Sequence, residues 1–274
     1  MTGKQPVSFF IPAYNCEKNL EESVLSILKG NFCAGDEIVI VNDGSTDGTE
    51  SIIDGLVADH PVIKKINHSV NKGGGAARNT AIENAQYDIL FCLDSDNILI
   101  CSTIQKLQEY MLQTSAHVAS FGEICFFIGH RANITHKWIY KKETTLDDCL
   151  STHMVPGASG NYLFTRESWQ RAGGYPEFAG AMDTWGFGFR QLATGSKMVS
   201  MPDSYYLHRY GHESYWVRES KLGKISQINL EILRPYLDLI MDEDVDYIQS
   251  TEGRINWFDH LSMRPIRLKS GFTD

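Results

Sequence analysis

The sequence predicts an α/β protein built on a mostly parallel, doubly wound sheet that is flanked by helices. Short apolar runs typical of buried strands alternate with segments whose apolar residues recur at helical spacing. Polar side chains also gather directly after several of these apolar runs. Strands that alternate with helices in this way are typical of βαβ units, in which neighbouring strands run parallel. With 274 residues, 42% of them hydrophobic, the chain is long enough to bury a sizeable core.

The elements follow one another in order along the first hundred residues. Strands are predicted at 7–11, 38–41, 62–66 and 89–93. Helices are predicted at 17–29, after residue 47 and at 75–85. Asp47 with Glu50 three residues later resembles an N-terminal capping arrangement for the second of these helices. From residue 217 onward, one or two amphipathic helices are expected, with the acidic run 242–244 as a solvated linker.

Charge and hydropathy exclude several classes of function. The formal net charge of −9 argues against a broad nucleic-acid-binding face, so no nucleic-acid partner is expected. No apolar stretch approaches the roughly 18 to 20 residues that span a bilayer, and the N-terminus lacks the apolar core of a signal peptide. The six cysteines are scattered without metal-binding spacing. We therefore expect a cytoplasmic protein whose cysteines are reduced.

Polar residues follow three of the predicted strands, at 12–15, 42–45 and 94–96. Because ligands of open parallel sheets bind outside the carboxyl ends of the strands, we expect a site at this edge. Asp94 and Asp96 follow a strongly apolar strand, and such a pair can share a hard divalent cation. The alternative is a solvated turn in which Asp96 caps the following segment.

The segment NKGGGAARN, residues 71–79, is rich in glycine. It matches neither the dinucleotide-binding fingerprint nor the P-loop. Its glycines nevertheless permit close approach of the backbone to a ligand. Arg78, on the opening turn of the predicted helix, could reach a base or a phosphate.

Four segments together resemble the motifs of glycosyltransferase family 2, in their order and their spacing. They are IPAYNCEKNLEESVLSIL, VNDGSTDGT, NKGGGAARN and LDSDN. Members of this family have the GT-A fold, a Rossmann-like α/β architecture, and the resemblance covers roughly residues 5–215. It implies a GT-A domain at 1–216, with a nucleotide-binding part at 1–100 and an acceptor and sugar part at 101–216. A helical C-terminal extension at 217–274 would follow.

The resemblance implies an inverting, divalent-metal-dependent glycosyltransferase of polysaccharide biosynthesis. The donor would be a nucleotide-sugar, expected to be a UDP-sugar, and the cofactor Mn²⁺ or Mg²⁺. A hexosyl or N-acetylhexosaminyl group would pass to a hydroxyl of a glycan or lipid-linked acceptor. The mildly basic segment Arg264–Lys269 could place the protein peripherally at the inner face of a membrane.

The resemblance also implies roles for individual residues. Those expected to contact the donor nucleotide are Pro12, Tyr14, Asn15, Asp43, Lys72, Gly73, Arg78, Asp94 and Ser95. Asp43 matches the carboxylate that accepts the base N3–H, although in NDGS it could equally be an Asx-turn residue. Asp96 would coordinate the cation directly, Asp94 would contact the ribose or reach the metal through water, and His212 would supply a third metal ligand.

Asp183 is expected to be the general base. It falls on the second member of an acidic pair that begins a helix in the family, whereas Met182 stands where the first member is normally Glu. This departure puts the acceptor contacts of that Glu in doubt. The alternative for Asp183 is a charge at a helix N-terminus.

Two other classes of function remain open. A DxD after an apolar strand is also the nucleophile motif of haloacid-dehalogenase-like phosphatases, but Ile98 stands where that pattern has Thr or Val. The second alternative is a catalytically inactive nucleotide-sugar-binding module on the same fold, for which Met182 is the one hint. The joint presence of Asp43, Asp94, Asp96 and Asp183 argues against inactivity.

Overall fold

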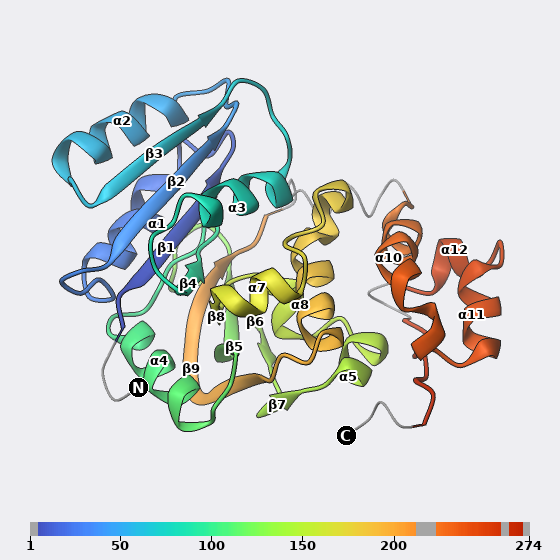
Figure 1. The fold of residues 1–274 in the computed structure, drawn as a ribbon. Coiled ribbons are helices and arrows are strands. Elements are labelled where there is room, and N and C mark those ends of the chain that lie inside the picture. Colours follow the sequence, from blue (N-terminus) through green and yellow to red (C-terminus); the bar gives the residue numbers. More distant parts are fainter. Residues whose placement is uncertain (1–4, 212–222, 259–262, 271–274) are drawn as a thin grey trace.

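The computed structural model describes residues 5–211, 223–258 and 263–270, and it confirms the predicted α/β class. The described strands form one nine-stranded sheet in the order β3-β2-β1-β4-β8-β5-β9-β7, with β6 paired to β5 (Figure 1). Its first four strands are parallel to one another. This architecture is the mostly parallel, doubly wound sheet that the alternating sequence pattern predicts.

The first half of the chain alternates strand and helix as expected. Its strands are β1 (Val7–Ala13), β2 (Glu37–Asp43), β3 (Ile63–His68) and β4 (Ile89–Cys92). Its helices are α1 (Leu20–Leu28), α2 (Thr49–Asp59), α3 (Gly74–Glu83) and α4 (Thr103–Gln113). The predicted strands therefore lie at the expected places, and several extend by one or two residues to the polar rim.

The second half of the chain is a mixed sheet with short helices. Its strands are β5 (Val118–Phe127), β6 (Ile134–Ile139), β7 (Glu143–Thr144), β8 (Leu163–Thr165) and β9 (Met198–Arg209). Its helices are α5 (Leu146–Ser151), α6 (Pro156–Ser159), α7 (Arg166–Arg171), the 3₁₀ helix η1 (Glu177–Met182) and α8 (Asp183–Ala193). Strand β8 runs antiparallel to both β4 and β5, whereas β9 runs parallel to β5.

Both faces of the sheet are covered, because successive side chains of a strand point to opposite sides. Phe9 and Ile11 of β1 pack in one core with apolar residues of α1, α2 and α4. Phe10, between them, packs in a second core with residues of α3 and α8. Strands buried on both faces are therefore apolar without interruption, which is the pattern that the sequence shows.

The start of α2 differs from the sequence prediction. Helix α2 begins at Thr49, with Gly48 in the capping position. The Asp47 carboxylate accepts the Thr49 N–H at 3.0 Å, and Glu50 pairs with Lys65 at 2.9 Å instead of reaching back to the cap. The Asp47 side chain thus still binds a backbone N–H at the start of α2, but the predicted part of Glu50 in the cap is wrong because Glu50 pairs with Lys65.

The C-terminal residues form helices that pack against α8 (Figure 1). They are α10 (Ile225–Leu233), the 3₁₀ helix η2 (Arg234–Leu239), α11 (Asp242–Gln249) and α12 (Gly253–Asn256). Ile232 of α10 and Trp257 share one apolar core with Trp185 and Phe189 of α8. The extension thus forms a continuous core with the helix that begins at Asp183. The predicted domain boundary at 216/217 lies outside the described residues.

The acidic run 242–244 is not a solvated linker. It opens α11, and Asp244 is only 1% exposed. The Asp244 carboxylate accepts both the backbone N–H of Arg267 at 2.9 Å and its Nε–H at 2.8 Å, while Lys269 pairs with Asp242 at 2.7 Å. The basic segment is neutralised within the chain, which weakens the case for membrane contact through these charges.

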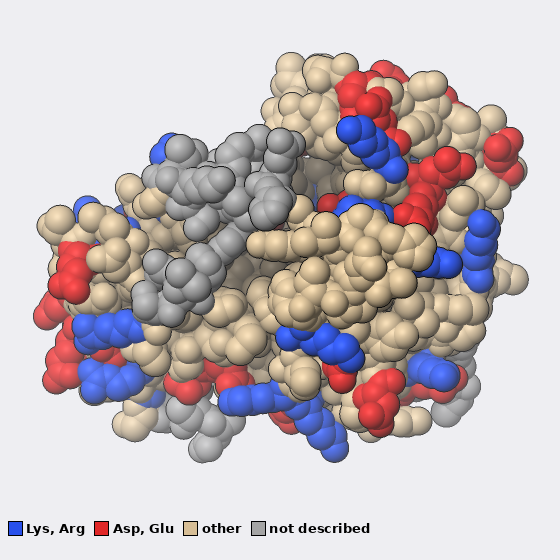
Figure 2. Space-filling view, turned by 180° about the vertical axis from the view of Figure 1, so that it is seen from behind, with Lys and Arg blue, Asp and Glu red and all other residues tan. Residues whose placement is uncertain are grey.

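The structure also shows the distribution of charge on one face and the state of the cysteines. On the face shown in Figure 2, described basic and acidic side chains lie intermixed and form no broad basic surface. All six cysteines are free thiols. Within the described parts of the chain, no helix is both long and apolar enough to cross a membrane.

The shared core predicts that the extension stabilises the whole protein. Ile232 is fully buried, so Ile232→Ala is expected to lower the free energy of unfolding by about 2 to 5 kcal/mol. Ile255 in α12 is 59% exposed, so Ile255→Ala serves as the matched control, with an expected change within about 0.5 kcal/mol. Denaturant unfolding measures both. Equal effects of the two substitutions would contradict the shared core.

Candidate active site

The predicted donor-site residues differ in their exposure to solvent. The exposed residues are Tyr14, Asn15 and Lys72. The half-buried residues are Pro12, Gly73, Asp94, Ser95 and Asp96. The buried residues are Asp43, Arg78 and Asp183. Because β1, β2 and β4 are parallel neighbours, the residues that follow them share one edge of the sheet.

The ends of β1 and β2 are tied together by Asn15. This residue has a positive φ of 47°, and its side-chain Oδ1 accepts the Thr46 N–H at 2.8 Å. Its own N–H donates to Ser45 Oγ at 3.1 Å. The turn leaves the neighbouring Tyr14 47% exposed, so the phenol ring is open to a ligand at this rim.

Asp43 fixes the glycine-rich loop between β3 and α3. Its carboxylate accepts the backbone N–H groups of Lys72 and Gly73, each at 2.9 Å, and lies 2.6 Å from Nδ1 of His68. Gly73 has a φ of 94°, which a residue with a side chain rarely adopts. Asp43 therefore holds the loop that carries Lys72. Its predicted role in reading a base stays a prediction.

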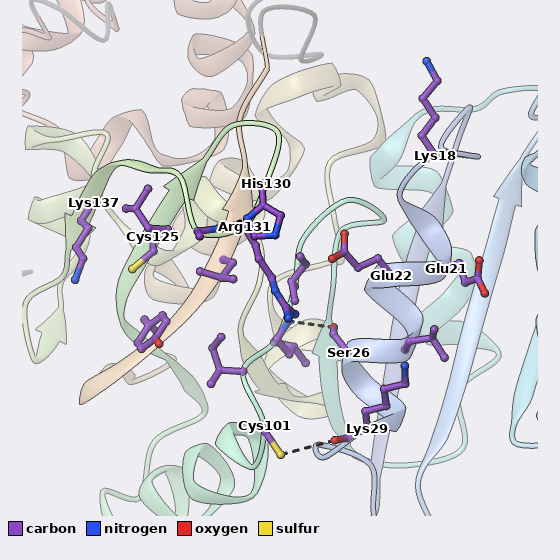
Figure 3. A pocket seen from close by; sticks show the side chains of 18 of the residues that line it. Lys18, Glu21, Glu22, Ser26, Lys29, Cys101, Cys125, His130, Arg131 and Lys137 are labelled. Carbon is purple, nitrogen blue, oxygen red and sulfur yellow. Dashed lines mark hydrogen bonds between the residues drawn. The ribbon is translucent and has the colours of Figure 1, made fainter.

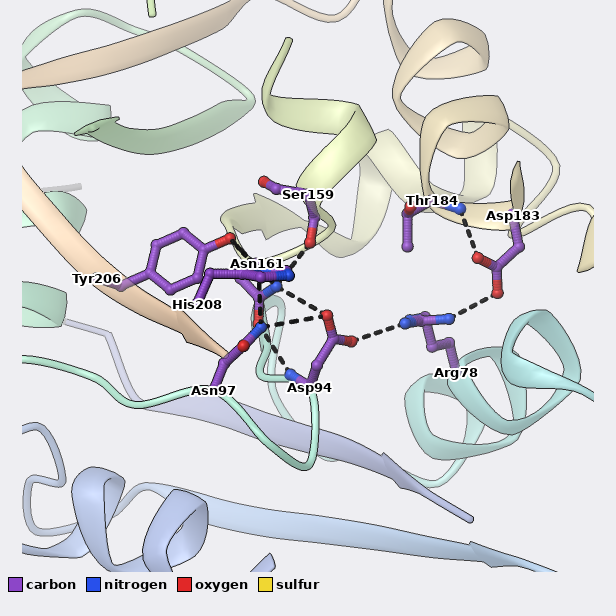
Figure 4. Close-up of polar contacts among 9 residues, drawn as sticks. All are labelled: Arg78, Asp94, Asn97, Ser159, Asn161, Asp183, Thr184, Tyr206 and His208. Atoms are coloured by element: carbon purple, nitrogen blue, oxygen red, sulfur yellow. Dashed lines mark hydrogen bonds and ion pairs between the residues drawn. The ribbon is translucent and has the colours of Figure 1, made fainter. Parts of the chain in front are cut away.

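Arg78 joins two predicted functional carboxylates, as Figure 4 shows. Its Nη1 donates to Asp183 Oδ2 at 2.6 Å, and its Nη2 donates to Asp94 Oδ1 at 2.7 Å. A Cβ atom on Gly74 would lie 2.6 Å from Arg78 Nη1 and 2.8 Å from Asp183 Oδ2. Glycine at this position is therefore required by the ion pair. The sequence placed Arg78 near the donor but did not predict this bridge.

Burial and charge shift the pKa values of this pair. Burial raises the pKa of Asp183 above its ordinary value, and the Arg78 guanidinium opposes the rise. Burial would lower the pKa of Arg78, but the charges of Asp183 and Asp94 hold it well above its ordinary value. Arg78 thus stays a cation, and Asp183 is a carboxylate with increased affinity for a proton.

Asp94 is held in place by polar residues that the sequence did not single out. Its N–H donates to Asn161 Oδ1 at 2.8 Å, and the Asn161 amide donates back to Asp94 Oδ2 at 2.9 Å. Asn97 lies 3.5 Å from the same oxygen and 3.3 Å from Nδ1 of His208. Asn97 lies in the predicted LDSDN motif and Asn161 lies two residues before β8, but only the fold brings them together.

The family comparison decides the identity of this chain. The model of glycosyl transferase family 2 matches residues 8–171, which is more than half of the chain. The chain belongs to glycosyl transferase family 2. The matched region includes the three polar strand ends and the glycine-rich loop, whereas Asp183 lies beyond it.

Curated relatives match parts of the chain. An uncharacterised glycosyltransferase of Haemophilus influenzae is 34% identical over 107 residues, which cover 39% of this chain and 42% of that protein. Chondroitin synthase of Escherichia coli is 31% identical over 174 residues, which cover 62% of this chain and 24% of the synthase. The chain therefore spans less than half the length of either relative.

Solved structures share the fold at low sequence identity. S. aureus TarS in complex with UDP-GlcNAc superposes with a TM-score of 0.65 at 18% identity, over 93% of this chain and 68% of TarS. The mannosyltransferase PcManGT from Pyrobaculum calidifontis, in complex with GDP-Man and Mn²⁺, gives a TM-score of 0.65 at 20% identity, over 85% of this chain and 65% of PcManGT. These similarities confirm the GT-A fold.

The residues at the end of β4 fit a divalent cation of the kind expected in this family. Burial, together with the nearby charge of Asp94, raises the pKa of Asp96 to about 7, although Arg209 opposes the rise. A cation would relieve this cost. In the described ranges, no group of three or more His, Cys, Asp or Glu is placed to hold a metal ion. Two carboxylates suffice for Mg²⁺, which keeps water and substrate phosphate oxygens among its ligands.

The predicted third ligand, His212, lies outside the described residues. The described histidine in this region is His208 of β9, which lies beside Asn97. Burial lowers the pKa of His208 to about 4. A neutral imidazole has a free ring nitrogen and can serve as an acceptor or as a ligand.

The resemblance places Met182 where family members normally carry Glu, at a position beyond the residues that the family model matches. It is 3% exposed and packs in the core that α8 shares with the C-terminal helices. An ionised carboxylate would lose its solvation there. The apolar side chain therefore suits its surroundings, and the departure from the family pattern goes together with the extension that covers this position.

A groove of about 980 Å³ lies apart from these residues, between α1 and the β5–β6 hairpin (Figure 3). Its described lining includes both acidic and basic side chains, among them Glu21, Lys29 and Arg131, but none of the predicted site residues. Cavity size therefore does not identify the candidate site. The carboxylates at the strand ends do.

The Arg78 bridge predicts a pH-dependent loss of stability in Arg78→Met. The buried Asp183 and the half-buried Asp94 would lose their cation, which is expected to lower the free energy of unfolding by about 3 to 5 kcal/mol at neutral pH. The pKa of Asp183 is already raised and would rise further without the guanidinium. Its protonation at lower pH would therefore remove part of the penalty, so that the loss is greater at about pH 8 than at about pH 5.

Denaturant unfolding of Arg78→Met at both pH values measures this effect. Arg234 pairs with Glu231 on the surface and is 64% exposed, so Arg234→Met is the matched control. Its expected change is below about 1 kcal/mol. A loss in Arg78→Met that grows as the pH falls would contradict the assignment.

Proposed function

We propose that this family 2 protein is an inverting glycosyltransferase that moves a hexosyl or N-acetylhexosaminyl group from a nucleotide-sugar to a hydroxyl. The donor is a UDP-sugar, and the acceptor is a glycan or a lipid-linked saccharide. The observation that carries the proposal is the arrangement of Asp94, Arg78 and Asp183. The Arg78 guanidinium pairs both with Asp94, a predicted donor-site carboxylate, and with the buried carboxylate of Asp183. The nucleotide-sugars bound to TarS and PcManGT support the donor class.

The donor nucleotide would lie over the carboxyl ends of β1 and β2. The exposed Tyr14 ring offers an apolar face for the base, while Asp43 keeps the loop of Lys72 and Gly73 in place. The ammonium group of Lys72 is exposed and can approach the ribose or a phosphate. These residues bind and orient the donor without taking part in bond making.

Asp96 and Asp94 would hold a divalent cation together with the donor diphosphate. When bound, Mn²⁺ or Mg²⁺ supplies Lewis-acid stabilisation of the charge that develops on the departing nucleoside diphosphate. Asn161 and Arg78 fix the Asp94 carboxylate through both of its oxygens. The Mn²⁺ bound to PcManGT supports this use of a metal.

Asp183 would act as the general base. It takes the proton of the acceptor hydroxyl as the hydroxyl oxygen attacks the anomeric carbon from the side opposite the nucleotide. The bond from that carbon to the diphosphate oxygen breaks, the electron pair leaves with the nucleoside diphosphate, and the configuration inverts. Burial raises the pKa of Asp183, which makes the carboxylate a stronger base.

The phosphatase alternative is not retained. The chain belongs to a glycosyltransferase family, and this membership favours sugar transfer over phosphate-ester hydrolysis.

Nucleotide binding tests the donor site. Calorimetric titration with UDP, GDP and CDP, each with and without Mn²⁺, is expected to give tight, Mn²⁺-dependent binding of UDP. Asp96→Ala should weaken this binding by about tenfold or more, because the cation loses a ligand. The control is Asp88→Ala. Asp88 directly precedes β4, whereas Asp96 lies beyond the other end of that strand, and the side chain of Asp88 is 82% exposed. Absence of binding for all three nucleotides would overturn the donor site.

Turnover tests the base. Asp183→Asn is expected to lower the acceptor-dependent rate of UDP release by at least about a hundredfold, because the amide cannot take the proton of the acceptor hydroxyl. UDP affinity should stay within about twofold of that of the unaltered protein, since Asp183 is not proposed to contact the nucleotide. Near-normal turnover in Asp183→Asn would show that another group is the base. The same assay separates an active enzyme from an inactive binding module.

A further inference from the structure

Aromatic and imidazole side chains line up across three strands next to the candidate site. In the sheet register, His136 of β6 is opposite Phe126 of β5, which in turn is opposite His208 of β9. Trp138 lies two residues beyond His136 on β6, so its side chain points to the same face. We call His136, Phe126, His208, Trp138 and Tyr210 the aromatic strip.

The rings of the aromatic strip are in contact with one another. His136 stacks on Phe126 with 4.3 Å between ring centroids and an angle of 6° between the planes. Phe126 lies 4.9 Å from His208 and 5.0 Å from Trp138. Tyr210 packs edge-on against His136 at 5.8 Å. An unbroken chain of ring contacts therefore joins His208 to Tyr210 through Phe126 and His136.

One end of the strip meets the candidate site, and the other is open to solvent. His208 lies beside Asn97, which contacts Asp94. At the other end His136 is exposed, and Tyr210 is 38% exposed. Cross-strand aromatic pairs stabilise sheets, and that accounts for Phe126, which is 5% exposed. The stability of the sheet does not require the exposed rings of His136 and Tyr210.

The flanking loop adds polar groups to the same region. His153, in the loop between α5 and α6, packs edge-on against Trp138 at 5.5 Å. The chain continues from this loop through α6 to Asn161, which holds Asp94. Imidazole and phenol groups thus border the rings with hydrogen-bonding atoms. Such a surface suits a ligand that is flat and apolar on its faces but polar around its rim.

We propose that the aromatic strip binds saccharide units of the acceptor, beyond the unit that carries the reacting hydroxyl. This inference rests on the proposed function. A pyranose ring presents C–H groups on its face and hydroxyls around its edge, so it can stack on rings while its hydroxyls bond to imidazole or phenol. Because the strip begins beside the donor-site residues and runs to the sheet edge, it favours acceptors that are chains of several sugars.

The experiment measures binding to immobilised disaccharides and longer oligosaccharides that contain glucose, galactose, mannose or N-acetylglucosamine, with UDP and Mn²⁺ present. The unaltered protein is expected to bind longer chains more tightly than disaccharides. His136→Ala and Tyr210→Ala should each weaken this binding by about fivefold, while His136→Phe should keep most of it because a stacking face remains.

The matched control is Ile139→Ala. Ile139 is 70% exposed on the same strand, one residue from Trp138 and therefore on the opposite face of the sheet. Its affinity for oligosaccharides should be unchanged. Calorimetric binding of UDP, measured on the same preparations, should be unchanged in every variant and shows that each one is folded.

Two outcomes would overturn the inference while the proposed function stands. In one, the alanine variants bind oligosaccharides as the unaltered protein does. In the other, the protein binds UDP but no oligosaccharide of the set. If the unaltered protein did not bind UDP, the proposed function would be overturned, and the inference with it.

Discussion

The candidate site depends on one buried interaction, the guanidinium of Arg78 between Asp94 and Asp183. Arg78 lies on α3, Asp94 follows the next element β4, and Asp183 begins α8, which lies 105 residues further along the chain than Arg78. Asp183 is buried and Asp94 is half-buried, so ionised carboxylates in these positions need a cation close by. Glycine at position 74 is a consequence, because a Cβ atom there would collide with both members of one ion pair.

The placement of Asp183 also depends on the opposite side of α8. Trp185 and Phe189 of this helix pack against the C-terminal helices, and Gly186 lies so close to Ile232 that an added Cβ would be 2.8 Å from its side chain. The C-terminal helices thus pack against α8, while Arg78 binds Asp183, the first residue of that helix. Met182 belongs to the same core, so its apolar side chain is a packing feature of this protein.

Two sequence expectations were wrong for the same reason. In both, a charged side chain pairs with a residue from another segment of the chain. The acidic run at 242–244 reads as solvated, but Asp244 is buried against Arg267. Glu50 reads as part of a cap, but it pairs with Lys65 of the neighbouring strand. A local sequence pattern reflects only the preferences of its own segment. It does not show which charged side chain from another part of the chain lies next to that segment in the fold.

The sequence by itself determined the α/β class, the order of the first strands and helices, and the family, because apolar periodicity and the linked motifs are local properties of the chain. It also placed Asp43, Asp94 and Asp96 at one edge of the sheet, since parallel strands end on the same side. Only the tertiary structure decided that Arg78 bridges two carboxylates, that Asn161 holds Asp94, and that rings from three strands form one strip. The residues in each of these contacts come from different parts of the chain, so their local sequence patterns do not show that they meet.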